Sequence, residues 1–194
     1  MVVEHLVPKT LSEATALGRE PETVFMAGGT DVMAALSDGM SRDRDAVFAQ
    51  FEARWRDEPL VLDKWFALEA CSARADTLAR VRRLLAHPRF NARNPNRVRS
   101  LVGAFTLRNF ARFHAADGAG YAFAADQVLA LDPTNPQLAA AIAGAFNLWR
   151  RFDAVRRGMM QAALQRIASA PGLSPDVTEV VARTLERPGG PMPA

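Results

Sequence analysis

Along most of the chain, apolar residues recur at steps of three and four positions, and this spacing predicts helices rather than strands. The pattern is clearest between Gln137 and Arg151, where Leu138, Ile142 and Trp149 fall on one stripe of a helix. We therefore predict that every segment from residue 32 onward is helical. The predicted helices are Asp43–Trp55, Pro59–Glu69, Thr77–Ala86, Asn96–Phe105, Tyr121–Leu131, Gln137–Arg151, Ala154–Ala168 and Pro175–Leu185.

Several predicted helices begin where a short polar residue precedes proline. The polar side chain can accept a hydrogen bond from a first-turn N–H group, and proline at the first helical position loses no hydrogen bond. Helices of this length joined by short loops pack as antiparallel pairs, so the pattern predicts an all-α fold, an α-solenoid of the armadillo or HEAT type. The three starts of this kind are Asn94-Pro95, Asn135-Pro136 and Ser174-Pro175.

The two ends of the chain differ from this helical region. Residues 1–31 predict a short βα-type appendage, in which a helix after Thr10 is followed by a buried strand at Val24–Met26 and a turn at Gly28-Gly29. Residues 188–194 are rich in proline and glycine, and we predict a disordered tail. The predicted domains are therefore 1–31, 32–187 and 188–194.

The charge pattern argues against a nucleic-acid partner. The net charge is only +3, and acidic residues are interspersed among the arginines. No apolar stretch approaches the roughly 20 residues that cross a bilayer, and the first residues lack a basic and apolar secretion signal, so neither a membrane nor an export pathway is expected. The expected location is cytoplasmic.

Candidate chemical groups are few. The histidines are His5, His87 and His114, and none has a second histidine or an acid at the spacing of metal ligands. We expect His87 at a helix end, where a protonated imidazole ring would interact favourably with the terminal carbonyl groups. For His114 we expect a structural role. Cys71 is the only cysteine, and we expect it to be a small, buried residue of a helix. The residues expected in the core or at helix contacts are Trp55, Trp65, Phe66, Phe90, Phe105, Phe110, Phe113, Tyr121, Phe146 and Trp149.

Several short motifs occur together in the helical region: Leu60–Phe66, Asn94–Leu101, Gly103–Phe105, Phe113-His114, Asp117–Tyr121, Asn135–Gln137 and Arg151–Asp153. Their order and spacing resemble the C-terminal domain of bacterial alanyl aminopeptidase N over residues 31–187. In that family this region is an α-solenoid that packs over the catalytic domain, closes the active site and restricts the access of peptides. The zinc ligands and the catalytic glutamate belong to other domains.

The resemblance implies that this chain alone is not an enzyme and holds no zinc, because a helical cap cannot replace a metal-activated water and its general base. Gln137 matches a position that faces the substrate cavity in the family. Asn94, Asn96, Arg97 and Arg99 match the helix start after the Asn-Pro turn. A structural role is expected for these four residues, and a polar groove is the alternative.

The first residues carry a different resemblance. The segments Val7–Ala14 and Phe25–Asp31 are similar to the start of the FAD-binding subunit of molybdenum hydroxylases such as xanthine dehydrogenase and carbon monoxide dehydrogenase. There, a turn equivalent to Ala27, Gly28, Gly29 and Thr30 cradles the flavin pyrophosphate with backbone N–H groups. Only the first flavin-contacting segment is present, so FAD binding is not expected.

The leading prediction is a non-catalytic helical domain that docks on an aminopeptidase catalytic domain or another protein. One alternative is an autonomous helical-repeat scaffold that binds a partner on its concave side. Another is a fragment of a flavin-binding oxidoreductase subunit. Because Thr30-Asp31 occurs in both resemblances, we hypothesise that the chain is fused or recombined at this string, and a genuine fusion, a truncation and a misassembled reading frame are the three explanations considered.

Overall fold

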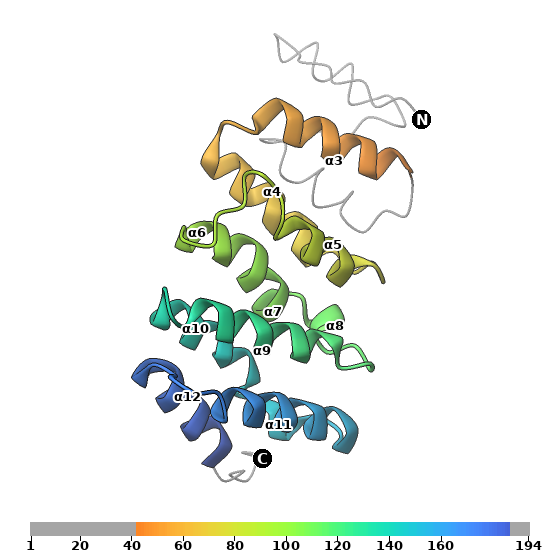
Figure 1. The fold of residues 1–194 in the computed structure, drawn as a ribbon. Helices are drawn as coiled ribbons and strands as arrows, with labels where there is room; N and C mark the ends of the chain where they lie inside the picture. The colour runs from red at the N-terminus through yellow and green to blue at the C-terminus, as the bar shows by residue number, and fades with distance from the viewer. Residues whose placement is uncertain (1–41, 187–194) are drawn as a thin grey trace, which may run out of the picture.

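The computed structural model describes residues 42–186, in which every regular element is a helix (Figure 1). The predicted all-α fold is therefore confirmed for this part of the chain. The predicted appendage at 1–31, its turn at Ala27–Thr30, His5 and the tail at 188–194 lie outside the described residues. The elements are α3 (Arg42–Trp55), α4 (Pro59–Cys71), α5 (Thr77–Leu84), α6 (Pro95–Val98), the π-helix η1 (Arg99–Gly103), α7 (Ala104–Arg108), α8 (Phe110–Phe113), α9 (Ala119–Leu131), α10 (Pro136–Ala143), the 3-10 helices η2 (Gly144–Phe146) and η3 (Trp149–Arg151), α11 (Ala154–Ala168) and α12 (Pro175–Glu186).

The helices stack in chain order into an elongated array (Figure 1). Helix α4 contacts α3, α5, η1 and α7, while α10 contacts α9 and α12. Each helix thus buries its apolar face mainly on near neighbours in the sequence, as expected for a solenoid. No helix in the described part of the chain is long and apolar enough to cross a membrane.

Helices α6, α10 and α12 follow one another down one side of the array, which we call the proline side because each of them begins with proline (Figure 1). The residues that precede these prolines, Asn94, Asn135 and Ser174, stand at intervals of about 40 residues, which is the length of one HEAT or armadillo repeat. The structure therefore shows a repeat that is not obvious from sequence identity.

The three predicted helix starts are confirmed. The Asn94 side chain accepts hydrogen bonds from the backbone N–H groups of Asn96 and Arg97. The Asn135 Oδ1 accepts one from Leu138 N at 3.1 Å, and Ser174 Oγ accepts one from Val177 N at 3.3 Å. Each cap satisfies an N–H group that lacks a partner inside its helix.

The prediction of one continuous helix over Gln137–Arg151 is wrong. Helix α10 ends at Ala143, and two 3-10 helices follow. Contacts with α12 hold this path, because Trp149 Nε1 donates to the Thr184 carbonyl at 3.0 Å and Thr184 Oγ1 donates to Asn147 Oδ1 at 2.9 Å. The spacing of the apolar residues correctly predicted which side chains are buried. It did not predict that the backbone between them changes from an α-helix to 3-10 helices.

The segment predicted as Asn96–Phe105 is longer than expected. Helical structure runs from Pro95 to Arg108 and includes the π-helical turn η1. A short helix, α8, then follows at Phe110–Phe113, where none was predicted.

Aromatic side chains form much of the core, as predicted. Phe105 lies at the centre of one cluster, with ring centroids 6.2 Å from Phe113 and 5.4 Å from Phe123. The predicted residues Trp65, Phe66, Tyr121, Phe146 and Trp149 are also buried. Phe110 is the exception among the predicted residues, because it is 69% exposed.

The side chain of Asn109 joins the first part of the array to the second. Its Nδ2 donates to the carbonyl groups of Ala70 and Ser72, both at 2.8 Å, near the end of α4. Its Oδ1 accepts a hydrogen bond from the Arg112 N–H group at 3.2 Å, in the first turn of α8. One buried amide thus caps the ends of two helices that are far apart in the sequence.

Helix α9 approaches α8 so closely that only glycine fits at the contact. A Cβ atom on Gly120 would lie 2.3 Å from the Phe113 carbonyl oxygen. Because that oxygen belongs to the backbone, the two helices would have to separate to admit a methyl group. Gly120, in the first turn of α9, is therefore required for the packing of this helix on α8.

We predict that Gly120→Ala lowers the free energy of unfolding by about 2–3 kcal/mol, because the added methyl group forces α8 and α9 apart. Gly158→Ala is the matched control, since a Cβ there meets nothing within 4 Å in the middle of α11. The control should raise the free energy of unfolding by up to about 1 kcal/mol. Denaturant unfolding followed by circular dichroism measures both, and equal effects of the two substitutions would contradict the close approach.

Candidate functional site

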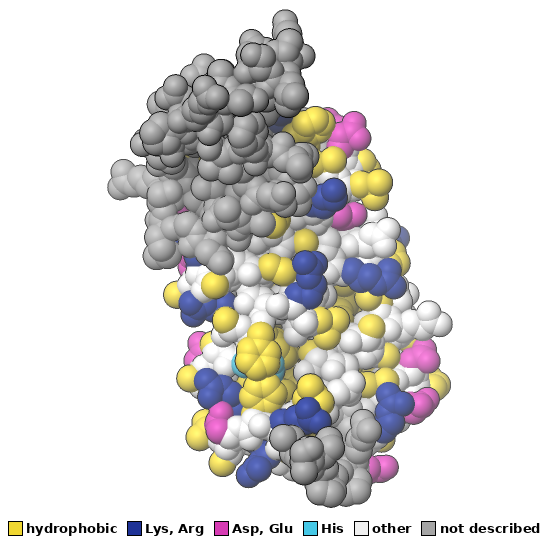
Figure 2. All heavy atoms as spheres, turned by 180° about the vertical axis from the view of Figure 1, so that it is seen from behind, with side chains coloured by type: hydrophobic (Ala, Val, Ile, Leu, Met, Phe, Trp, Pro, Cys, Tyr) yellow, Lys and Arg dark blue, Asp and Glu magenta, His cyan; other side chains and the backbone are white. Residues whose placement is uncertain are grey.

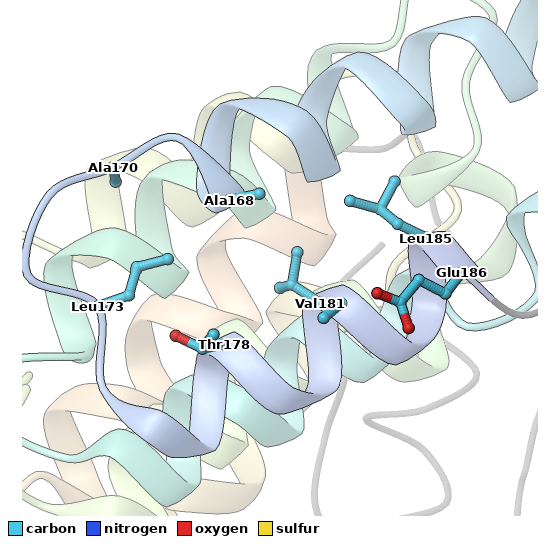
Figure 3. A pocket seen from close by; sticks show the side chains of 8 residues that line it. Ala168, Ala170, Leu173, Thr178, Val181, Leu185 and Glu186 are labelled. Atoms are coloured by element: carbon cyan, nitrogen blue, oxygen red, sulfur yellow. The ribbon is translucent and has the colours of Figure 1, made fainter.

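A cavity lies between the end of α11 and α12 (Figure 3). The cavity has a volume of about 430 Å³, and the apolar side chains of Leu173, Val181 and Leu185 line much of it. Its polar groups are the Thr178 hydroxyl and the Glu186 carboxylate, with no basic group or thiol among its lining side chains. The cavity therefore offers no pair of groups for nucleophilic or acid–base chemistry.

Of the four polar candidate residues at the start of α6, only Arg97 is buried. The side-chain oxygen of Asn94 caps the helix, because it accepts hydrogen bonds from Asn96 N at 3.0 Å and from Arg97 N at 3.4 Å. Arg97 turns into the protein and is only 6% exposed. Asn96 and Arg99 stay exposed, and Arg99 Nη1 donates to Asn96 Oδ1 at 3.4 Å. Two of the four candidate residues thus have structural contacts, and two face solvent.

Arg97 forms a buried electrostatic contact between α6 and α4. Its Nη1 lies 3.2 Å from Asp63 Oδ1, without the geometry of a hydrogen bond, so this contact is ionic. The guanidinium also lies over the Phe66 ring, 5.1 Å from the centroid. Ser100 Oγ donates to the Arg97 carbonyl at 2.8 Å and lies 3.3 Å from Asp63 Oδ1. These contacts fix the start of α6 on α4.

Gln137 is exposed in the first turn of α10. Helices α6 and α10 both lie on the proline side of the array (Figure 1). The structure therefore brings the starts of two helices, with exposed Asn96, Arg99 and Gln137, to one side of the molecule. These side chains can donate and accept hydrogen bonds, and Arg99 adds a positive charge.

His87 lies at a helix end, as predicted, and its backbone N–H group donates to the Leu84 carbonyl at 3.1 Å. It lies after α5 and packs on two aromatic rings, with centroids 5.6 Å from Trp65 and 5.5 Å from Phe66. Burial lowers the pKa of His87 below its ordinary value, although the Glu52 carboxylate, 3.6 Å from Nε2, acts in the opposite direction. The predicted position is therefore confirmed, but the lowered pKa disfavours the imidazolium that we expected there.

His114 is half-buried and has the structural role that was predicted. Its Nδ1 lies 3.0 Å from the buried Tyr121 hydroxyl, and its ring stacks on Phe152 with centroids 4.2 Å apart. Burial lowers the pKa of His114 to about 4, and the nearby Arg156 guanidinium acts in the same direction. The imidazole is therefore neutral near pH 7, where it can share one hydrogen bond with Tyr121.

Cys71 is half-buried at the end of α4, and burial raises the pKa of its thiol. Its Sγ lies 3.8 Å from the Ala104 carbonyl oxygen. A raised pKa disfavours the reactive thiolate, so these observations agree with the expected packing role.

We predict that Arg97→Met lowers the free energy of unfolding by about 2–3 kcal/mol, because it leaves the Asp63 carboxylate without its cationic partner. Arg99→Met, two residues away and exposed, should change it by less than about 0.5 kcal/mol. Guanidinium chloride titration of both variants tests this difference. Similar losses in the two variants would show that the Arg97 contact does not anchor α6.

We predict that acid weakens the fold through His114. Its pKa is lower in the folded chain than the ordinary 6.5, so its contribution to stability is complete above pH 6.5 and is lost as the pH falls toward about 4. Because the ring is half-exposed, we expect a loss of about 1–2 kcal/mol rather than the full value of the shift. Unfolding measured from pH 7 to 4 should show a weaker pH dependence for His114→Asn than for the unchanged chain, and identical slopes would refute this role.

Comparison with known proteins identifies the array. Residues 14–186 match the domain family described as DUF3458_C, with ARM repeats. The chain is 43% identical to aminopeptidase N of Caulobacter vibrioides over 160 residues and 41% identical to aminopeptidase N of Escherichia coli over 159 residues. These alignments cover 82% and 80% of this chain, but only 18% of each relative.

A solved structure agrees with these relatives. The crystal structure of Legionella pneumophila aminopeptidase A in complex with aspartic acid superposes with a TM-score of 0.75 and 31% sequence identity, over 80% of this chain and 18% of that one. The family match begins at residue 14 and so includes part of the segment that we assigned to the appendage. The chain belongs to the family of C-terminal armadillo-repeat domains of aminopeptidase N.

Proposed function

We propose that this chain is a non-catalytic cap, which docks on the catalytic body of an aminopeptidase and restricts the access of peptides. The observation that carries the proposal is its 43% identity to only 18% of the length of aminopeptidase N of Caulobacter vibrioides. The chain therefore corresponds to a small part of that enzyme, and most of the enzyme has no counterpart in it.

The chemistry of the chain supports a non-catalytic role. The sequence contains no His-Glu-x-x-His motif, which supplies two zinc ligands and the general base in zinc peptidases of this kind. The described residues hold no group of three or more histidine, cysteine, aspartate or glutamate side chains that fits a metal ion. We therefore assign no catalytic step to these residues.

The proline side of the array supplies the surface that would face the substrate. Gln137 and Arg99 are exposed there, and an amide and a guanidinium can both bind the carbonyl or carboxylate groups of a peptide. We propose that Gln137 lines the substrate cavity in the assembled enzyme. Asn94 and Arg97 serve to hold the helix that carries Arg99.

Addition of the full chain to Caulobacter vibrioides aminopeptidase N lacking its aligned C-terminal region tests the proposal. We expect the chain alone to show no hydrolysis of an alanyl anilide, because it has no zinc-binding motif. On addition to the truncated enzyme, it should bind and lower the hydrolysis of long peptides relative to dipeptides. Calorimetry measures the binding, and chromatography of the products measures the length preference.

Two further variants separate docking from substrate contact. Gln137→Ala should leave the binding constant unchanged but alter the preference for peptide length, because the side chain faces the cavity and not the catalytic body. Gln161→Ala, at an exposed position of α11, is the control and should change neither quantity. If the unchanged chain neither binds the truncated enzyme nor alters its preference, the cap proposal is wrong.

A further inference from the structure

Exposed hydrophobic side chains gather in one part of the array. In the part of the chain that the structure describes, the large hydrophobic residues with high exposure are Leu60, Leu107, Phe110, Leu148 and Val155. All except Leu60 belong to two segments, residues 104–114 and 147–157. Single exposed apolar side chains are common on monomeric proteins, but a gathering of them indicates an interaction surface.

The two segments meet through three rings, which we call the aromatic patch: Phe110, His114 and Phe152. The Phe110 ring lies against both others, with centroids 4.5 Å from His114 and 5.9 Å from Phe152. Arg156 Nε donates to the His114 carbonyl at 2.8 Å and so holds the two segments together. Figure 2 shows exposed hydrophobic side chains over a histidine, with Lys or Arg side chains on either side.

The aromatic patch is small. Phe110 is 69% exposed, whereas His114 and Phe152 are half-buried. A stable interface between two folded domains buries about 1,200–2,000 Å², which is far more than one exposed ring and its neighbours supply. A short segment that places one apolar side chain on Phe110 fits this surface better, because a single anchor residue can supply much of the binding free energy.

The surroundings of the aromatic patch are strongly basic. The two segments contain six arginines and one carboxylate, that of Asp153. Three of the arginines, Arg112, Arg150 and Arg156, donate to backbone carbonyl groups of the protein. The other three, Arg108, Arg151 and Arg157, are exposed. An exposed guanidinium binds a carboxylate through paired hydrogen bonds, so the segment that fits the patch carries acidic residues beside its apolar one.

Two other occupants fit the surface less well. Nucleic-acid bases bind by stacking on ring faces, but His114 already stacks on Phe152 with centroids 4.2 Å apart. The exposed aliphatic side chains of the two segments favour an apolar protein side chain instead. A second copy of this chain would bring one basic surface against another, which disfavours self-association through the patch.

The aromatic patch is also separate from the surface that we assign to the substrate cavity. Helix α8, which begins with Phe110, lies on the opposite side of the array from the proline side (Figure 1). In the proposed assembly Gln137 lines the cavity on the proline side. A ligand on the aromatic patch therefore leaves that cavity open.

We infer that the aromatic patch and its exposed arginines bind an acidic segment of a separate protein, a short stretch of aspartate and glutamate residues that carries one large apolar side chain. The apolar side chain packs on Phe110, and the flanking carboxylates pair with Arg151 and Arg157. Complementary charge sets the orientation of the segment and speeds its association. This binding function goes beyond the proposed cap and does not depend on it.

A labelled peptide tests the binding of such a segment to the full chain. The probe consists of aspartate and glutamate residues with one central phenylalanine, and both of its ends are blocked. Fluorescence anisotropy should show binding that weakens by about tenfold or more when serine replaces the phenylalanine or when glutamine replaces the acids. Binding should also weaken between about 50 and about 300 mM salt, because the paired charges are exposed.

Matched variants of the chain locate the site. Phe110→Ser should weaken peptide binding by about tenfold or more, whereas Leu60→Ser, which removes a side chain that is 74% exposed on α4, should change it by less than about twofold. Circular dichroism verifies that each variant retains the fold.

The arginines are tested in the same way. Arg151→Gln with Arg157→Gln should weaken binding and reduce its salt dependence, whereas Arg83→Gln with Arg93→Gln, at exposed positions elsewhere, should change neither.

Four outcomes would overturn the inference. The first is a peptide that does not bind, or that binds the patch variants as tightly as the unchanged chain. The second is a single-stranded DNA oligonucleotide that binds the patch more tightly than the peptide does. The third is a dimer of this chain that Phe110→Ser dissociates. The fourth is displacement of the peptide by the truncated Caulobacter vibrioides enzyme, since the catalytic body would then cover the patch.

Discussion

The side chain of Asn109 determines how the two parts of the array meet. Its amide nitrogen bonds the carbonyl groups at the end of α4, and its oxygen caps α8. Buried carbonyl and N–H groups at helix ends are costly when they lack partners, so this position tolerates few other residues. The placement of α8 in turn determines where Phe110 and His114 lie. A structural amide therefore sets the position of the exposed Phe110 side chain.

The helical fold could be predicted because its causes are local. The step of three and four residues marked the buried stripes, and caps such as Asn135 marked where helices begin. The break after Ala143 could not be predicted, because Trp149 and Thr184 create it across 35 residues of sequence. The repeat of about 40 residues was also present in the sequence, in the spacing of its polar-proline helix starts.

The candidate site was less predictable, because side-chain direction depends on the packing of neighbouring helices. Asn94 and Arg99 belong to the same motif as Arg97, yet only Arg97 turns inward to meet Asp63. Phe110 has the apolar side chain of a core residue, yet it is exposed, whereas the neighbouring Asn109 turns inward to the end of α4. Asn109 itself carried no recognisable signal beyond its preference for helix caps. The contact between the Phe110 and Phe152 rings joins two segments that are far apart in the sequence, so neither segment alone predicts it.

Hydrogen exchange of the full chain, measured alone and with Caulobacter vibrioides aminopeptidase N lacking its aligned C-terminal region, tests the docking of this domain most directly. Exposed backbone amides exchange more slowly when a partner covers them or stabilises their helix. We predict added protection in α6 and α10, which begin on the side of the array that faces the substrate cavity in the proposed assembly, with little change in α11. No change anywhere in the chain would contradict the docking of this domain.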